Sequence, residues 1–183
     1  MKYSYYTCDV FTDTRFGGNP LAVVVDAVGL SDVQMQRVAR EFNYSETTFV
    51  LPPEHGQTRR VRIFTPVEEL PFAGHPNIGT AFVLGATGGS DASRVVFEEP
   101  AGLVGIDMVR ESGRVVSCEL KAPQALTLGK TAAPADVAHA LSLDEADIVT
   151  GTHSPITASV GLGFLMVELA DRDALARAGI NMA

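Results

Sequence analysis

Short apolar runs separated by turn residues predict a chain rich in β-strands up to about residue 120. The runs combine aromatic and β-branched residues, which favour strands, and most of them are no longer than eight residues. The seven expected strands are residues 3–11, 21–25, 44–51, 59–64, 94–97, 103–109 and 115–120. Residues 111–114 (Glu-Ser-Gly-Arg) predict a hairpin turn between the last two. Many strands with few helices favour an α+β fold over a doubly wound sheet.

One helix is marked at both of its ends. Ser31 and Gln34 fit a capping box, in which each residue satisfies a free N–H group of the other. Apolar residues then recur at helical spacing along one face, at Met35, Val38, Ala39 and Phe42. Asn43 can end the helix in the left-handed conformation. The pattern therefore predicts an amphipathic helix over residues 31–43.

A second helix is expected to start at Pro76 and to continue through the apolar segment 77–84, directly after Gly74 and His75. Proline suits the first helical position, because its backbone angle is already correct and it has no N–H group to leave unpaired. Gly74 and His75 would then lie just before a helix N-terminus, where free N–H groups and the helix dipole attract anions. The sequence indicates a candidate anion site with a titratable imidazole beside it.

The pattern loosens after residue 121, where Pro123 and Gly129 interrupt it. We therefore expect two domains, residues 1–125 and residues 126–183. In the second domain the pattern predicts helices at residues 134–143 and 171–178, with a strand at residues 160–169 that contains two glycines.

Composition and charge narrow the classes of function. Apolar residues make up 46% of the 183 residues and charged residues 20%, which is an ordinary globular balance. The net charge is −8, and the densest basic cluster, Arg59, Arg60 and Arg62, reads as a solvated strand end, so nucleic acid is not an expected partner. No apolar run approaches the roughly 18 residues of a membrane span, and residues 1–6 are too polar for a signal peptide. A cytoplasmic protein without membrane attachment is expected.

Metal, disulfide and dinucleotide sites are not expected. Cys8 and Cys118 are far apart in sequence and lack the spacing of metal ligands. Three of the four histidines, His55, His139 and His153, are interpreted as structural or solvated. The Gly161–Gly163 segment lacks the third glycine of a dinucleotide fingerprint.

Glu46 and His75 are the two candidates for chemistry. In an extended segment Glu46 shares a face with Tyr44 and Thr48, so its carboxylate can point to an inward, largely apolar side, which suits a general acid or base. The alternative is an exposed glutamate on an edge strand. His75 can serve the anion site, or it can be a helix cap or an ordinary surface residue.

Four segments together resemble the phenazine biosynthesis-like isomerase family, whose members are related to diaminopimelate epimerase. They are residues 16–24 (FGGNPLAVV), 45–50 (SETTFV), 62–66 (RIFTP) and 70–81 (LPFAGHPNIGTA). Their order and spacing carry the resemblance, which runs through residues 1–120 and more faintly through residues 158–163.

The resemblance implies a diaminopimelate epimerase-like fold of two similar halves, each a curled, mostly antiparallel β-sheet around a central helix. It implies proton-transfer isomerisation of a small carboxylate without cofactor or metal, and a homodimer. The family's catalytic glutamate matches Glu46 and its histidine matches His75, while Ser45, Gly74 and Asn19 are expected to hold the substrate. The epimerases use two cysteines, and neither Cys8 nor Cys118 matches them.

The resemblance also implies an incomplete second half. Family members supply an aspartate and a Thr-Gly-Ser segment opposite the glutamate, and neither is found in residues 126–183. A naturally short protein, a piece of a longer one, and a cleft completed by another chain all fit this pattern. Unpaired strand edges would favour association. A non-catalytic module that binds a small ligand or assembles into oligomers is the alternative to the isomerase.

Overall fold

The computed structural model describes residues 2–182, which form two compact units. The first runs to Gln124 and the second begins at Ala125. That the second unit is the opening part of a domain similar to the first stays a prediction.

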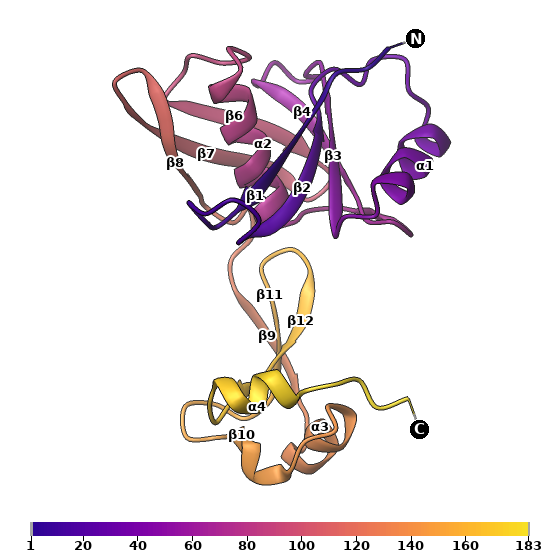
Figure 1. The fold of residues 1–183 in the computed structure, drawn as a ribbon, viewed down its shortest axis with the longest axis vertical. Coiled ribbons are helices and arrows are strands. Elements are labelled where there is room, and N and C mark those ends of the chain that lie inside the picture. Colours follow the sequence, from indigo (N-terminus) through magenta and orange to yellow (C-terminus); the bar gives the residue numbers. More distant parts are fainter. Residues whose placement is uncertain (1, 183) are drawn as a thin grey trace. The chain divides into compact units, whose positions relative to one another are not determined.

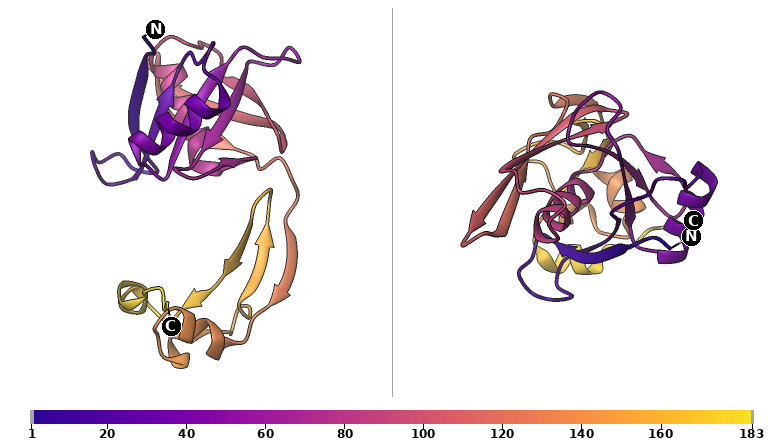
Figure 2. Two further views of the ribbon diagram at one scale, coloured as in Figure 1. Left: turned by 90° about the vertical axis from the view of Figure 1, so that its right-hand side faces the viewer. Right: turned by 90° about the horizontal axis from the view of Figure 1, so that it is seen from above.

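An eight-stranded, strongly curled sheet forms most of the first unit (Figures 1 and 2). Its strands are β1 (Tyr5–Val10), β2 (Asn19–Val24), β3 (Glu46–Leu51), β4 (Arg59–Phe64), β5 (Glu69–Leu70), β6 (Arg94–Glu99), β7 (Gly102–Glu111) and β8 (Arg114–Leu120). They follow the order β1-β2-β3-β4-β6-β7-β8, with β5 paired to β4. Pairing is antiparallel except between β2 and β3 and between β4 and β6, so the sheet is mostly antiparallel, as expected. The hairpin turn between β7 and β8 places Ser112 and Gly113 at positive φ, as that turn type requires.

Helix α2 (Gly74–Ala86) lies inside the curve of the sheet, as Figure 1 shows. It contacts strands from both ends of the sheet order, including β1 and β8. A helix that is apolar on all sides must be covered on all sides, and nine of its residues are buried. Gly79 permits the closest approach: a Cβ atom there would lie 2.5 Å from Leu21 Cδ2 and 2.8 Å from Val10 Cγ2.

Helix α1 (Asp32–Phe42) packs on the opposite, outer face of the sheet. Its predicted capping box is present, because Ser31 Oγ accepts from Gln34 N and Gln34 Oε1 accepts from Ser31 N. Asn43 ends the helix in the left-handed conformation, which confirms the prediction. A small core of fully buried side chains joins this helix to the sheet, with the rings of Phe49 and Phe64 in edge-to-face contact at 5.4 Å.

The predicted start of α2 was wrong by two residues. The helix begins at Gly74, so Pro76 is its third residue rather than its first, and His75 lies within the first turn. Proline is compatible with any position in the first turn, since none of the N–H groups there has a partner within the helix.

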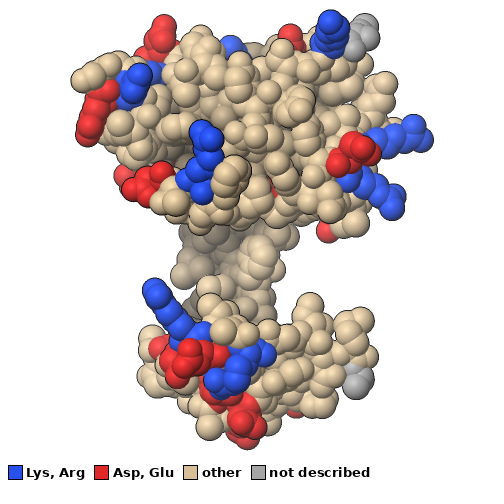
Figure 3. Space-filling view, viewed as in Figure 1, with Lys and Arg blue, Asp and Glu red and all other residues tan. Residues whose placement is uncertain are grey.

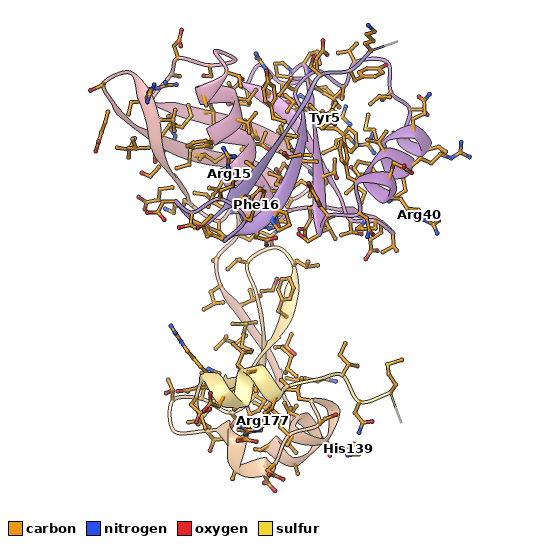
Figure 4. All side chains as sticks on the ribbon, in the orientation of Figure 1. Tyr5, Arg15, Phe16, Arg40, His139 and Arg177 are labelled. Carbon is orange, nitrogen blue, oxygen red and sulfur yellow. The ribbon has the colours of Figure 1, made fainter. Side chains whose placement is uncertain are left out.

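The second unit consists of two small sheets and two short helices. Its elements are β9 (Thr127–Thr131), α3 (Pro134–Ala140), a 3₁₀ turn (Glu145–Asp147), β10 (Ile148–Val149), β11 (Ile156–Ser159), β12 (Gly163–Met166), β13 (Glu168–Leu169) and α4 (Arg172–Arg177). Strand β11 lies between β9 and β12, and β10 pairs with β13. The sequence predicted both helices but not β9, β10 or β11, and it merged β12 and β13 into one strand. His139 lies on α3, and Arg177 of α4 forms an ion pair with Asp147 at 2.7 Å (Figure 4).

A buried carboxylate organises the loop between β3 and β4. Glu98 is on the face of β6 that points away from α2, and its two oxygens accept from the backbone N–H groups of Glu54, His55 and Gln57 at 2.6–3.2 Å. Burial opposes the charge, but these three hydrogen bonds together hold the pKa of Glu98 below its usual range.

Lowering the pH should release this loop before the sheet unfolds. Because the pKa of Glu98 is lowered by folding, its contribution to stability is present above the unfolded value of 4.5 and is lost as the pH falls through the folded pKa. Protection of the amides of residues 54, 55 and 57 against hydrogen exchange, relative to the intrinsic rate at each pH, should therefore fall on acidification. Glu98→Gln should lower the same protection at neutral pH. Unchanged protection in the Gln variant would contradict the role of the carboxylate.

Candidate active site

The site lies where the starts of two neighbouring strands meet the start of α2. Strands β2 and β3 are parallel, with Leu21 opposite Glu46, so both strands begin at the same edge of the sheet. Their first residues, Asn19 and Glu46, are thereby brought side by side although they are distant in sequence. The first turn of α2 adds Gly74 and His75 to the same place.

A chain of polar side chains connects these elements. Ser45 Oγ donates to Asn19 Oδ1 at 3.0 Å, and Asn19 Nδ2 lies 3.2 Å from His75 Nδ1. Since the amide oxygen of Asn19 is engaged by Ser45, its NH₂ group faces the imidazole. Asn19 therefore joins the loop before β3 to the start of α2.

The carboxylate of Glu46 contacts the other side of the same imidazole. Glu46 Oε2 is 3.3 Å from His75 Nε2, and the two side chains are only 16% and 9% exposed. The two atoms are close but not aligned for a hydrogen bond, and neither has another hydrogen-bond partner within residues 2–182. Buried polar atoms without partners are uncommon and mark places where a ligand or a proton can be received.

Glu46 points inward along with Thr48, as the sequence pattern predicted. Thr48 Oγ1 is 2.7 Å from Thr80 Oγ1 of α2, which fixes the face of β3 that is turned to the helix. The intervening residues Thr47 and Phe49 point to the opposite face. The alternative of an exposed glutamate on an edge strand is not what the structure shows.

Burial keeps the imidazole of His75 neutral near pH 7. Desolvation lowers the pKa of His75 below 6.5, and this effect outweighs the Glu46 carboxylate and the Pro20 carbonyl, which both favour the charged form. A neutral imidazole has one nitrogen that donates and one that accepts. When Asn19 donates to Nδ1, the ring proton is on Nε2, which faces Glu46.

The N-terminus of α2 has no side-chain cap, and there is free space beside Gly74. The residue before the helix is Ala73, and no side-chain hydrogen bond caps the first turn. A Cβ atom at Gly74 would meet nothing closer than Leu120 Cδ2 at 3.8 Å, so space remains beside its backbone. The N–H groups of a first turn left uncapped can bind a carboxylate or a developing oxyanion.

The structure thus brings together all five residues that the sequence singled out: Glu46, His75, Ser45, Gly74 and Asn19. Sequence reasoning missed the buried pair formed by Asn77 and Glu99, which lies beside the same helical turn. No motif marks that pair, because a glutamate at the end of a strand reads as an ordinary polar residue.

Other candidate groups lie apart from this cluster. Cys8 and Cys118 are both free and border one pocket between β1 and β8, where burial raises the pKa of each thiol to about 11. Arg15 and Phe16 lie on the loop between β1 and β2 (Figure 4). Across residues 2–182, no three His, Cys, Asp or Glu side chains gather as a metal site would need.

On the face seen in Figure 3, Lys and Arg lie next to Asp and Glu in several small groups, and most of the face is formed by other residues. No helix within the described part of the chain combines the length and apolar character needed to cross a bilayer.

The chain is similar to known isomerases. Trans-2,3-dihydro-3-hydroxyanthranilate isomerase of Pseudomonas aeruginosa is 47% identical over 121 residues, which cover 66% of this chain and 43% of the relative. An uncharacterised isomerase of Mesorhizobium japonicum is 42% identical over 178 residues, covering 95% of this chain and 58% of the relative. The chain therefore spans about half the length of these curated relatives.

Solved structures agree with the expected fold. A protein of Pseudomonas aeruginosa described as a predicted epimerase superimposes with a TM-score of 0.85 at 33% identity, over 98% of this chain and 64% of that one. The α+β, epimerase-like fold is thereby confirmed. The model of the family described as phenazine biosynthesis-like protein matches residues 8–183. This chain belongs to the phenazine biosynthesis-like protein family.

Proposed function

We propose that this chain carries the glutamate and histidine of an isomerase that moves a proton between two carbons of a small carboxylate. The observation that carries the proposal is the Glu46 carboxylate, 3.3 Å from the imidazole of His75, at the uncapped start of α2. In this reaction Glu46 takes a proton from one carbon and returns a proton to another. Proton and electron counts are unchanged overall, so the chemistry calls for no oxidant or reductant.

The start of α2 is proposed to hold the substrate anion. N–H groups of the first turn would bind the carboxylate, or the enolate that develops when the proton leaves, and the helix dipole would stabilise the negative charge. Removing a proton beside a carboxylate creates extra negative charge, and donors fixed in advance are the most effective way to stabilise it.

His75 and Asn19 are proposed to orient the reacting groups. A neutral imidazole with its proton on Nε2 can donate a hydrogen bond to Glu46 or to a substrate atom between them. Asn19 would fix that tautomer through Nδ1, and Ser45 would fix Asn19 in turn. A base held by neighbours in this way loses little entropy on reaching the reactive geometry.

The substrate class comes from the relatives. The Pseudomonas aeruginosa relative carries the name of an isomerase of trans-2,3-dihydro-3-hydroxyanthranilate, a small cyclic amino acid with a carboxylate. A carboxylate of this size suits a site built on one helical turn.

Isomerisation in heavy water tests the proposal. The protein is incubated with trans-2,3-dihydro-3-hydroxyanthranilate in D₂O, and NMR follows both the isomerised product and deuterium at the reprotonated carbon. We expect both, because a proton held by Glu46 can exchange with solvent before it is returned. Glu119→Gln, which removes one exposed carboxylate of β8, is the matched control and should behave like the parent protein.

The outcomes separate the two functions considered. Thermal stabilisation by the compound with neither product nor deuterium would favour the binding module. Absence of any binding would contradict the assignment of the site. The isomerase relatives favour catalysis over the binding module. Homodimer assembly and a cytoplasmic location stay predictions from the resemblance and the composition.

A further inference from the structure

A second buried carboxyl group lies beside the first turn of α2 and takes no part in the proposed proton transfer. Glu99 ends β6 and shares the inward face of that strand with Val95 and Phe97, both fully buried. Both carboxyl oxygens of Glu99 are inaccessible to solvent and lack an aligned hydrogen-bond partner within the described residues.

Asn77 connects this carboxyl group to the start of the helix. Its side chain is fully buried, and its Nδ2 donates to the carbonyl of Ala73, the residue that precedes α2, at 3.0 Å. The amide of the same side chain lies close enough to the carboxyl group of Glu99 to favour the charged form of that group. Farther along, the N–H of Ala101 donates to the carbonyl of Pro71 at 3.1 Å, which ties the end of β6 to the loop before α2.

We propose that Glu99 is a positioning residue that sets the charge at the start of α2. As a neutral acid it packs beside Asn77 and the first turn without adding a negative charge. The positive end of the helix dipole then acts on the bound anion alone. When it ionises, its carboxylate competes with that anion for the same end of the dipole. Anion binding at Gly74 and His75 should then weaken as Glu99 loses its proton.

The surroundings of Glu99 favour the neutral form. Burial raises the pKa of Glu99 to about 8, against the smaller, opposing effect of the nearby Asn77 amide. On its other side Glu99 borders a pocket that contains the imidazole of His55 and three paired groups. These are Arg60 with Glu54, Arg62 with Glu69, and Glu98 with three backbone N–H groups. On the side of α2 the ionisable groups are His75 and its contact Glu46.

Glu99 is expected to ionise in a different pH range from His75, Cys8 and Cys118. His75 has a lowered pKa and is neutral throughout the range from pH 7 to pH 9, and the thiols of Cys8 and Cys118, with pKa values of about 11, ionise above it. A change in NMR shift or anion affinity at the start of α2 between pH 7 and pH 9, if it is lost in Glu99→Gln, would therefore report on the ionisation of Glu99.

The first measurement needs no ligand. Carbon-13 NMR of the side-chain carboxyl of Glu99 should show titration near pH 8, and the backbone N–H signals of Gly74 and His75 should shift with the same midpoint. In Glu99→Gln, which keeps the shape and an acceptor for Asn77, these backbone signals should not move between pH 7 and pH 9. A carboxyl that titrates near pH 4 to 5 would overturn the proposal, whether or not the Gln variant folds.

The second measurement uses anthranilate as the probe anion and rests on the proposed function. Its carboxylate stays ionised from pH 7 to pH 9, so a pH effect belongs to the protein. The dissociation constant should rise roughly tenfold or more over that range for the parent and for the exposed-charge control Glu119→Gln, as expected for a second negative charge near the bound anion. It should stay flat for Glu99→Gln.

The two measurements fail in different ways. Equal pH dependence in the parent and Glu99→Gln would overturn the proposed role of Glu99. No anthranilate binding at any pH would count against the anion site of the proposed function, and the NMR titration would then decide the inference about Glu99 on its own.

Discussion

Glu46→Gln should abolish isomerisation while the fold stays intact. Glutamine keeps the size and the polar contact toward His75, but it cannot accept a proton from carbon. A positioned general base contributes roughly 100- to 10,000-fold to a rate, so turnover should fall by at least about 100-fold. Product formation by NMR measures the loss, and the amide NMR spectrum of the variant verifies that β3 and α2 are unchanged.

Two further variants sharpen this test. Glu46→Asp keeps the carboxylate but withdraws it by about one carbon–carbon bond, so its rate should lie between those of the parent and the Gln variant. Glu119→Gln removes an exposed carboxylate and should leave the rate unchanged. A Gln variant that turns over at the parent rate would show that another group is the base, and the proposed mechanism would be wrong.

Phe49→Ala should cause a large loss of stability without changing a residue of the site. The ring is fully buried, contacts Phe64 edge to face, and belongs to the core that joins α1 to the outer face of the sheet. Truncating a buried phenylalanine removes apolar contact and leaves a cavity, which costs about 3–5 kcal/mol. Urea unfolding followed by the amide signals of the first unit measures the change in free energy.

Val33→Ala is the matched control on α1. This side chain is 60% exposed, so its truncation should change the free energy of unfolding by about 0.5 kcal/mol or less. Because Phe49 and Glu46 point to opposite faces of β3, the Ala variant should keep the contact between Glu46 and His75 while it remains folded. A loss for Phe49→Ala as small as that for Val33→Ala would contradict the described packing of α1.

Local signals in the sequence predicted much of the first unit. The capping box at Ser31 and the left-handed end at Asn43 act within a few residues, so the sequence alone is enough to place α1. Strand β4 shows the same: the strand predicted at residues 59–64, around Val61, Ile63 and Phe64, has the observed bounds. Local pattern singled out Glu46 and His75, but only the resemblance predicted that they share a site with Asn19. These residues are brought together by the parallel pairing of β2 and β3 and by the position of α2.

Features that depend on tertiary contacts could not be predicted. Strand β9 has five exposed residues and therefore no apolar alternation to detect; it forms because β11 pairs with it. The buried state of Glu99 depends on where α2 lies against β6, and the role of Glu98 depends on a loop more than 40 residues earlier. In each case the decisive partner is remote in sequence.

The central position of α2 has a consequence for biosynthesis. The strands that cover this helix lie on both sides of it in the chain, and β8 ends only at Leu120. While the ribosome is still adding β6 to β8, the apolar helix α2 is not yet covered by these strands. Exposed apolar segments bind chaperones and are prone to aggregation. The nascent chain should therefore form a stable first unit only after β8 has left the exit tunnel. The contact between Glu46 and His75 should form at the same stage.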